Sequence, residues 1–135
     1  MIDKFGRIKD NASSELSRIR RELSSTLSGI SRSLSNILKT AQTEGIVDKD
    51  VTPTMRDGRL VIPVMPAFKR KIRGIVHDES ASGKTVFIEP AEVVEANNRI
   101  RELESEERRE IIRILTSFSD ELGHYPRIFS ILMSF

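Results

Sequence analysis

The densest group of cationic side chains lies in the middle of the 135-residue sequence. Its members are Arg56, Arg59, Lys69, Arg70, Lys71, Arg73 and Lys84. Clustered cations of this kind could contact the phosphate backbone of a nucleic acid. They could equally form a solvated strand edge, because lysine on an edge strand opposes aggregation. Both interpretations stay open. Since Phe68 and Phe87 are explained as core residues, contact with a duplex backbone is favoured over stacking on single-stranded bases.

The segment Gly83-Lys84-Thr85 matches the end of a phosphate-binding P-loop. A P-loop also needs a glycine five positions before Gly83, where this chain has Asp78. In addition, a P-loop leads into a helix, whereas the β-branched residues that follow here favour a strand. We therefore expect a β-turn in which the glycine supplies a positive φ, and no nucleotide site.

Other side chains that could carry chemistry surround this turn. They are His77, Asp78, Glu79, Glu89, Ser80 and Ser82, with His124 much later in the chain. The acidic residues and His77 lack a second nearby histidine and a repeating ligand spacing. The serines lack a base and an orienting group, and His124 suits a helix end or solvent. The chain has no cysteine. We expect no catalytic residue, no metal site and no cofactor within these residues.

Two helical patterns flank this central region. The first runs from about Ile8 to Thr43. Its apolar positions are Ala12, Leu16, Ile19, Leu23, Ile30, Leu34, Ile37 and Ala41, with Thr26 or Leu27 filling the gap. Such steps of three and four form a heptad seam, which predicts a long helix packed on another helix.

The second helical pattern follows Pro90. Its seam comprises Val93 or Val94, Asn97, Ile100, Leu103, Ile111, Ile114, Phe118 and Leu122. We expect this helix to begin at Glu89-Pro90, because proline suits a first helical turn, to be solvated between Glu102 and Glu110, and to end near Gly123. Asn97-Asn98 is unfavourable inside a helix. Asn97 on the seam either fixes helix register or hydrogen-bonds the region before it, and a structural role is favoured.

The residues between the helices predict strands and turns. Asp57-Gly58 is a strong hairpin signal between Thr54–Arg56 and Arg59–Ile62. Pro63 and Pro66 mark an edge strand or its end. Further strands are expected at Gly74–His77 and Thr85–Ile88, so that three or four strands form a small antiparallel lobe.

The predicted fold is mainly α with a small antiparallel β lobe, in the α+β class. We expect a first helix over 1–44, a lobe over 45–90, a second helix over 91–123, and the start of a further helix over 124–135. The long helices would pair antiparallel, with the lobe inserted between them at the tip. Because two long helices and an apolar end do not close into a globule, we expect an arm cut from a longer protein. The sequence has neither a membrane-spanning run nor a signal peptide, which favours the cytoplasm.

Charge is segregated along these parts. The net charge of +2 for the whole chain divides into +2 for residues 1–52, +4 for 53–88 and −4 for 89–135. The small total therefore conceals a basic lobe and an acidic second helix, which indicates where contact with nucleic acid should be sought.

Three stretches closely resemble the MutS-II family, the bacterial paralogues of the mismatch-repair ATPase MutS. They are RDGRLVIPV at 56–64, GIVHDESASGKTVFIEP at 74–90 and VVEANNRIREL at 93–103. The resemblance covers roughly residues 12–122 and corresponds to the lever helices and clamp-like region that precede the ATPase domain in that family. The motif residues that have no assigned role are Gly74, Ser80, Ser82, Gly83, Glu89, Pro90, Asn97 and Asn98.

The resemblance implies a parent protein that binds branched or double-stranded DNA, suppresses homologous recombination, and is a homodimeric ATPase using ATP and Mg²⁺. An endonuclease activity and a role on the ribosome are implied for some members. This chain has no Walker motif, so only the lever and clamp role carries over to it. We expect a non-catalytic arm that contacts DNA through its basic lobe and transmits nucleotide state. The alternative is a structural or dimerisation module that packs on the parent ATPase or on a partner such as the ribosome, without DNA contact.

Overall fold

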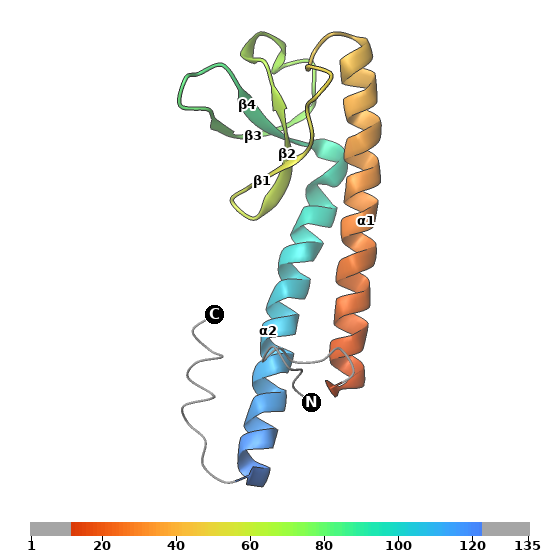
Figure 1. The fold of residues 1–135 in the computed structure, drawn as a ribbon, viewed down its shortest axis with the longest axis vertical. Helices are drawn as coiled ribbons and strands as arrows, with labels where there is room; N and C mark the ends of the chain where they lie inside the picture. Colours follow the sequence, from red (N-terminus) through yellow and green to blue (C-terminus); the bar gives the residue numbers. More distant parts are fainter. Residues whose placement is uncertain (1–11, 123–135) are drawn as a thin grey trace. The chain divides into compact units, whose positions relative to one another are not determined.

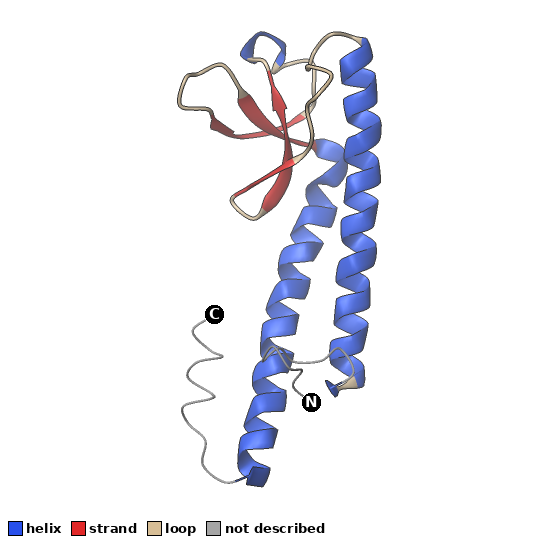
Figure 2. Ribbon diagram, viewed as in Figure 1, coloured by secondary structure: helices blue, strands red, loops and turns tan. Residues whose placement is uncertain are grey.

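A computed structural model of the chain describes residues 12–122, with side chains up to Phe118. The elements are α1 (Ser14–Thr43), β1 (Thr54–Arg56), β2 (Arg59–Val64), η2 (Pro66–Phe68), β3 (Gly74–Glu79), β4 (Val86–Pro90), η3 (Ala91–Val93) and α2 (Val94–Leu122) (Figure 1). Two helices and one antiparallel sheet confirm the predicted α+β class (Figure 2). The helix predicted over 124–135, together with Gly123 and His124, lies outside the described residues.

The chain divides into two compact units, each with its own packing. The helical unit contains residues up to Ser24 and from Glu102 onward, and the lobe unit contains Ser25–Arg101. Each of the two long helices contributes to both units, since the divisions fall inside α1 and α2.

In the helical unit, the start of α1 packs against the second half of α2. The helix α1 begins at Ser14 and is capped by Ser13, whose Oγ accepts a hydrogen bond from the Leu16 N–H at 2.9 Å. Leu16, Ile114 and Leu115 form a buried apolar cluster in this unit. The Arg20 Nε lies 2.9 Å from the Glu107 Oε2.

The acidic stretch of α2 is less solvated than its sequence suggests. Glu110 is only 8% exposed, because its carboxylate accepts hydrogen bonds from the Ser13 hydroxyl at 3.0 Å and from Arg113. Leu103 in the same stretch is fully buried. The expectation of a solvated helix between Glu102 and Glu110 was therefore wrong at Glu110, while the burial of Leu103 agrees with its predicted place on the seam.

In the lobe unit, α1 ends with a glycine cap. Gly45 has a φ of 75°, its N–H donates to the Gln42 carbonyl, and the Ile46 N–H donates to the Ala41 carbonyl at 2.8 Å. This pair of bonds is a Schellman motif, in which the left-handed residue satisfies the last carbonyls of the helix. Ile46 and Ala41 are both buried beside it. Along the same helix Leu38 is buried while Ile37 is half-buried, and Thr26 rather than Leu27 fills the gap in the seam.

The four strands form one antiparallel sheet in the order β1-β2-β4-β3. The Asp57-Gly58 turn joins β1 to β2, with both residues at positive φ, as a type I′ hairpin requires. Pro63 pairs with Phe87 beyond the end of β1, where β2 has only β4 beside it. This is a local sheet edge, the position where proline is tolerated.

The end of the last strand differs from the sequence prediction. Glu89 and Pro90 belong to β4, pairing with Ile75 and Gly74, so α2 begins only at Val94 after the short η3 turn. The strands β2 and β3 both run antiparallel to β4 and are therefore parallel to each other. Residues 65–73 form the crossover that joins them, and this segment carries η2 and four of the eight lysine and arginine residues in 45–90.

Candidate nucleic-acid interface

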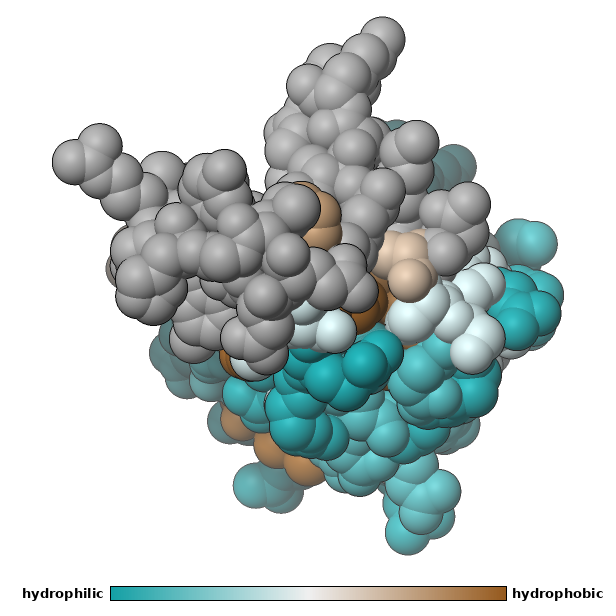
Figure 3. Space-filling model, turned by 90° about the horizontal axis from the view of Figure 1, so that it is seen from below, coloured by the Kyte–Doolittle hydropathy of each residue, from teal (hydrophilic) through white to brown (hydrophobic). Residues whose placement is uncertain are grey.

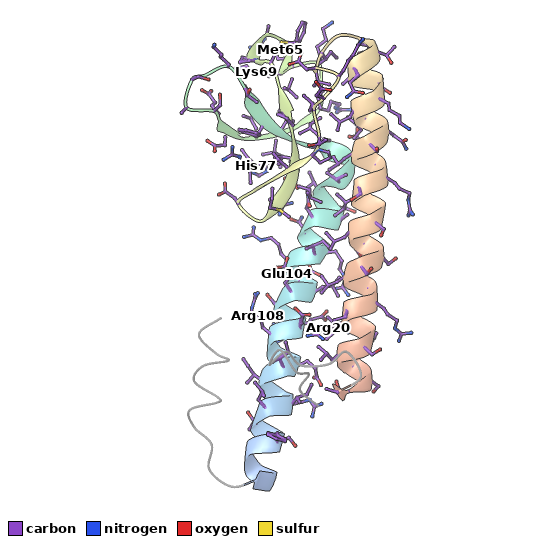
Figure 4. The ribbon with its side chains drawn as sticks, viewed as in Figure 1. Arg20, Met65, Lys69, His77, Glu104 and Arg108 are labelled. Carbon is purple, nitrogen blue, oxygen red and sulfur yellow. The ribbon has the colours of Figure 1, made fainter. Side chains whose placement is uncertain are left out.

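The basic crossover, defined as residues 69–73, is exposed at each of its cationic positions. Lys69, Arg70, Lys71 and Arg73 are all solvent-exposed, while Ile72 is half-buried. The segment follows η2, whose Phe68 carbonyl accepts a hydrogen bond from the Lys71 N–H at 2.9 Å. At its end the Arg73 carbonyl accepts one from the Ala91 N–H at 2.9 Å. The backbone is thus fixed at both ends while the cationic side chains face water. Figure 4 places Lys69 close to Met65 on the lobe, with His77 further away.

A cleft of about 440 Å³ adjoins the basic crossover. Its lining consists of Asn36, Ile37, Thr40, Ala41, Glu44, Ile46, Lys71, Ile72, Arg73 and Glu92. Two carboxylates therefore share the cleft with Lys71 and Arg73 and offset part of their charge. Lys69 and Arg70 are not among its lining residues, so we expect the positive potential to be strongest around them.

The two other exposed cations among the DNA candidates, Arg56 and Lys84, lie away from the basic crossover in sequence. The Arg56 guanidinium stacks over the Phe87 ring at 4.1 Å from the ring centroid, and its NH1 lies 3.8 Å from the Asp78 Oδ2. Lys84 occupies the turn between β3 and β4. Because β2 ends where β4 begins, this turn lies at the same end of the sheet as η2.

Arg59 is not available to a phosphate, and its place among the DNA candidates was wrong. It is 7% exposed, and its Nε donates to both oxygens of Glu89 at 2.8 Å. Its NH2 also donates to the Val94 carbonyl at 3.1 Å. The charge of Arg59 is balanced by Glu89 inside the lobe, because a buried guanidinium requires a partner anion.

Glu89 is the centre of this buried polar network. Besides Arg59, its carboxylate accepts hydrogen bonds from the His77 Nε2 at 2.7 Å and from the Asn97 Nδ2 at 2.8 Å. Full burial of Glu89 acts to raise the pKa of its carboxyl, but the hydrogen bonds from Arg59, His77 and Asn97 outweigh that effect. The pKa of Glu89 is therefore lowered.

Asn97 attaches the start of α2 to the sheet. Its side-chain Oδ1 accepts from the Leu60 N–H at 3.3 Å, and its Nδ2 donates to the Leu60 carbonyl at 3.2 Å. Extending the β2–β4 register places Pro90 opposite Leu60, and proline has no N–H to offer. The asparagine amide supplies the pair of bonds that a strand residue would make there. Of the two alternatives for Asn97, hydrogen bonding to the lobe is confirmed.

The remaining motif residues shape the backbone or face solvent. Gly83 has a φ of 70°, and its N–H donates to the Ser80 carbonyl at 2.9 Å. The Ser80 Oγ accepts from the Thr85 N–H at 3.1 Å and lies 3.4 Å from the Ser82 Oγ. The predicted β-turn with a glycine at positive φ is confirmed, and it joins two strands. Asn98 is exposed on α2.

Two further properties of the described residues bear on function. No group of three or more histidine, aspartate or glutamate side chains in that part of the chain could hold a metal ion. None of the described helices is long and apolar enough to cross a membrane. The coloured part of the face shown in Figure 3 is largely hydrophilic.

The buried network was missed in the sequence because its members are far apart. Arg59 precedes Glu89 by thirty residues, and the prediction from composition placed Arg59 with the other cations of the lobe. One signal was available: Asn97 lies on a helix seam, where a polar side chain needs a partner. The alternation that places Arg59 on the same face of β2 as Val61 was a second signal.

Together, the fold and this surface define a class: an α+β module in which a small sheet with a basic crossover is inserted between two long helices. No family model matches the chain. Endonuclease MutS2 of Finegoldia magna is 50% identical over 118 residues, which is 85% of this chain and 14% of that protein. Endonuclease MutS2 of Enterococcus faecalis is 42% identical and that of Lactobacillus johnsonii 40% identical, each over 126 residues, 93% of this chain and 16% of the relative.

The chain is a MutS2 (MutS-II) family sequence, and the resemblance found in its motifs is confirmed. It spans only 14–16% of the length of these relatives and corresponds to one segment of them.

Proposed function

We propose that this chain is the lever and clamp segment of a MutS2-type protein and that its basic crossover contacts the phosphate backbone of duplex or branched DNA. The observation that carries the proposal is the exposure of Lys69, Arg70, Lys71 and Arg73 on a crossover whose backbone is held at both ends. Cations presented in this way gain affinity by releasing counterions from DNA, without reading its sequence.

In the parent protein, ATP and Mg²⁺ would bind outside this chain, and the helices would transmit the nucleotide state to the lobe. The residues around Gly83 do not fit a nucleotide, since they form a hairpin turn between strands and not a loop that opens a helix. The relatives carry the name endonuclease, and the proposal assigns neither ATP hydrolysis nor DNA cleavage to any residue here.

The test is fluorescence anisotropy of labelled duplex and branched DNA titrated with the chain at increasing salt. With four phosphate contacts, the logarithm of affinity should fall with the logarithm of salt at a slope of about −3 to −4. The double variant Lys69→Glu/Arg70→Glu should lose at least about tenfold in affinity at low salt and should flatten this slope by about 2.

The matched control is Lys39→Glu/Lys49→Glu, which makes the same change in net charge at two exposed positions outside the lobe sheet. It should retain most of the affinity. Equal losses of DNA affinity in both double variants would show that the effect depends only on net charge and not on the basic crossover. Absence of any binding at low salt would overturn the proposal and leave the structural or dimerisation role, on the parent ATPase or the ribosome, as the better account.

A further inference from the structure

The outer edge of β3 has two unusual properties. The strand lies at the end of the sheet order, and no other described strand pairs with it on the side away from β4. Its central residues Ile75 and Val76 are 48% and 50% exposed. Because consecutive strand residues point to opposite faces of a sheet, apolar surface is exposed on both faces of this edge. Sheet edges of this kind are templates for pairing with another strand.

The two ends of β3 carry charges of opposite sign. Exposed Lys71 and Arg73 precede the strand, and exposed Asp78 and Glu79 end it. A second copy laid antiparallel would place the cationic end of each strand beside the acidic end of the other, twice by symmetry. A parallel copy would place like charges together. We propose that β3 pairs antiparallel with β3 of a second copy of this chain, which extends the sheet across a two-fold axis.

The β-bulge in β3 sets the extent of this ladder. His77 is the extra residue between Val76 and Asp78 in the pairing with β4, and its ring is held inward by the hydrogen bond to Glu89. Gly74–Val76 is thus the regular part of the edge. A ladder this short buries little surface, so we expect weak, micromolar-to-millimolar association that depends on the flanking charges.

A charge swap tests the pairing by sedimentation velocity over a concentration series without DNA. Arg73→Glu or Glu79→Arg alone should weaken self-association about tenfold at low salt, because each creates two like-charge contacts per dimer. The double variant Arg73→Glu/Glu79→Arg should regain wild-type association to within about threefold, since the opposite charges again face each other. The matched control Arg101→Glu/Glu95→Arg, at two exposed positions on α2, should leave association unchanged, and circular dichroism should confirm the fold of every variant.

The absence of cysteine allows a second test that does not depend on charge. Ile75→Cys or Val76→Cys should form a disulfide-linked dimer rapidly on mild oxidation, while Ser82→Cys in the neighbouring exposed turn should not. A monomer at all concentrations, a double swap that fails to rescue, or equal cross-linking at all three positions would each overturn the proposal.

This inference stands apart from the DNA proposal, and Glu79→Arg separates the two. That change adds positive charge to the lobe, so it should strengthen DNA binding while it weakens self-association. If DNA binding is absent but the swap and cross-linking behave as expected, only the proposed function fails.

Discussion

Glu89 shows how one side chain can hold several elements of the lobe together. Glu89 lies on β4, and its carboxylate accepts hydrogen bonds from Arg59 on β2, His77 on β3 and Asn97 on α2. A buried carboxylate is costly unless its hydrogen-bonding capacity is filled. Since these donors come from elements separated in the sequence, the network can form only when strands and helix are correctly placed.

Replacing Asn97 with aspartate tests this network with a minimal change in shape. Asn97→Asp should destabilise the fold by about 2–4 kcal/mol, because a carboxylate would face Glu89 and leave the Leu60 carbonyl without a donor. Urea unfolding at neutral pH measures the change. Asn98→Asp is the matched control, because Asn98 is the exposed neighbour on the same helix, and it should stay within about 0.5 kcal/mol of the wild type. Similar losses from both substitutions would point to helix propensity instead.

The lowered pKa of Glu89 predicts a pH dependence of stability. A carboxyl whose pKa is lower in the folded than in the unfolded chain stabilises the fold at pH values above its ordinary pKa of 4.5. This contribution is lost as the pH falls through the folded pKa. Glu89→Gln removes it, so the gap in unfolding free energy between wild type and variant should be largest near neutral pH and should narrow below pH 4.5.

Urea titrations at a series of pH values measure this gap. The exposed position Glu95 provides the comparison, and Glu95→Gln should show a small gap that does not change with pH. A gap for Glu89→Gln that stays constant below pH 4.5 would mean that the network does not depend on the ionised carboxylate.

At the scale of elements, the contact between β3 and β4 depends on a missing side chain. A Cβ at Gly74 would lie 2.1 Å from the Glu89 carbonyl oxygen and 2.9 Å from the Pro90 Cα. Backbone atoms cannot move aside as a flexible side chain would, so β3 would have to separate from β4. The strand that carries His77 to Glu89 is therefore placed by a glycine at its first position.

Two glycine-to-alanine substitutions should have opposite signs. Gly74→Ala should destabilise the fold by about 2–4 kcal/mol, because the methyl group collides with the backbone of β4. Gly29→Ala in α1, where a Cβ meets nothing within 4 Å, should stabilise it by about 0.5–1 kcal/mol through helix propensity. Thermal unfolding followed by circular dichroism distinguishes them. A Gly74→Ala variant that unfolds at the same temperature as the wild type would show that a Cβ at this position does not collide with the backbone of β4.

Elements defined by local signals were predictable from the sequence, and those defined by distant partners were not. The Asp57-Gly58 hairpin follows from two residues that accept positive φ, and the α1 seam follows from its apolar period. By contrast, the end of β4 and the burial of Arg59 depend on pairing between segments far apart in the chain. In the candidate interface, the basic crossover was identified from composition alone, and the structure then separated exposed Arg70 from buried Arg59.

On the scale of the whole molecule, the two units differ in how much apolar surface they bury. Among the described residues of the helical unit, the buried apolar side chains are Leu16, Ile19, Leu103, Ile114 and Leu115, and Ala12 and Ile111 pack against this core. The lobe unit buries apolar residues from β2 and β4, together with several from α1. Since local stability follows the number of buried apolar contacts, we expect the helical unit to open more readily.

Hydrogen exchange with mass spectrometry can test this difference unit by unit. In the wild-type chain, amides in residues 14–24 and 102–118 should exchange faster than those in β2 and β4. Leu16→Ala, at a fully buried position, should lower the opening free energy of the helical unit by about 2–4 kcal/mol and leave β2 and β4 protected. Leu27→Ala, at a position 38% exposed, should change little. If Leu16→Ala accelerates exchange equally in β2 and β4, the chain opens as one cooperative body, and the division into two units has no energetic meaning.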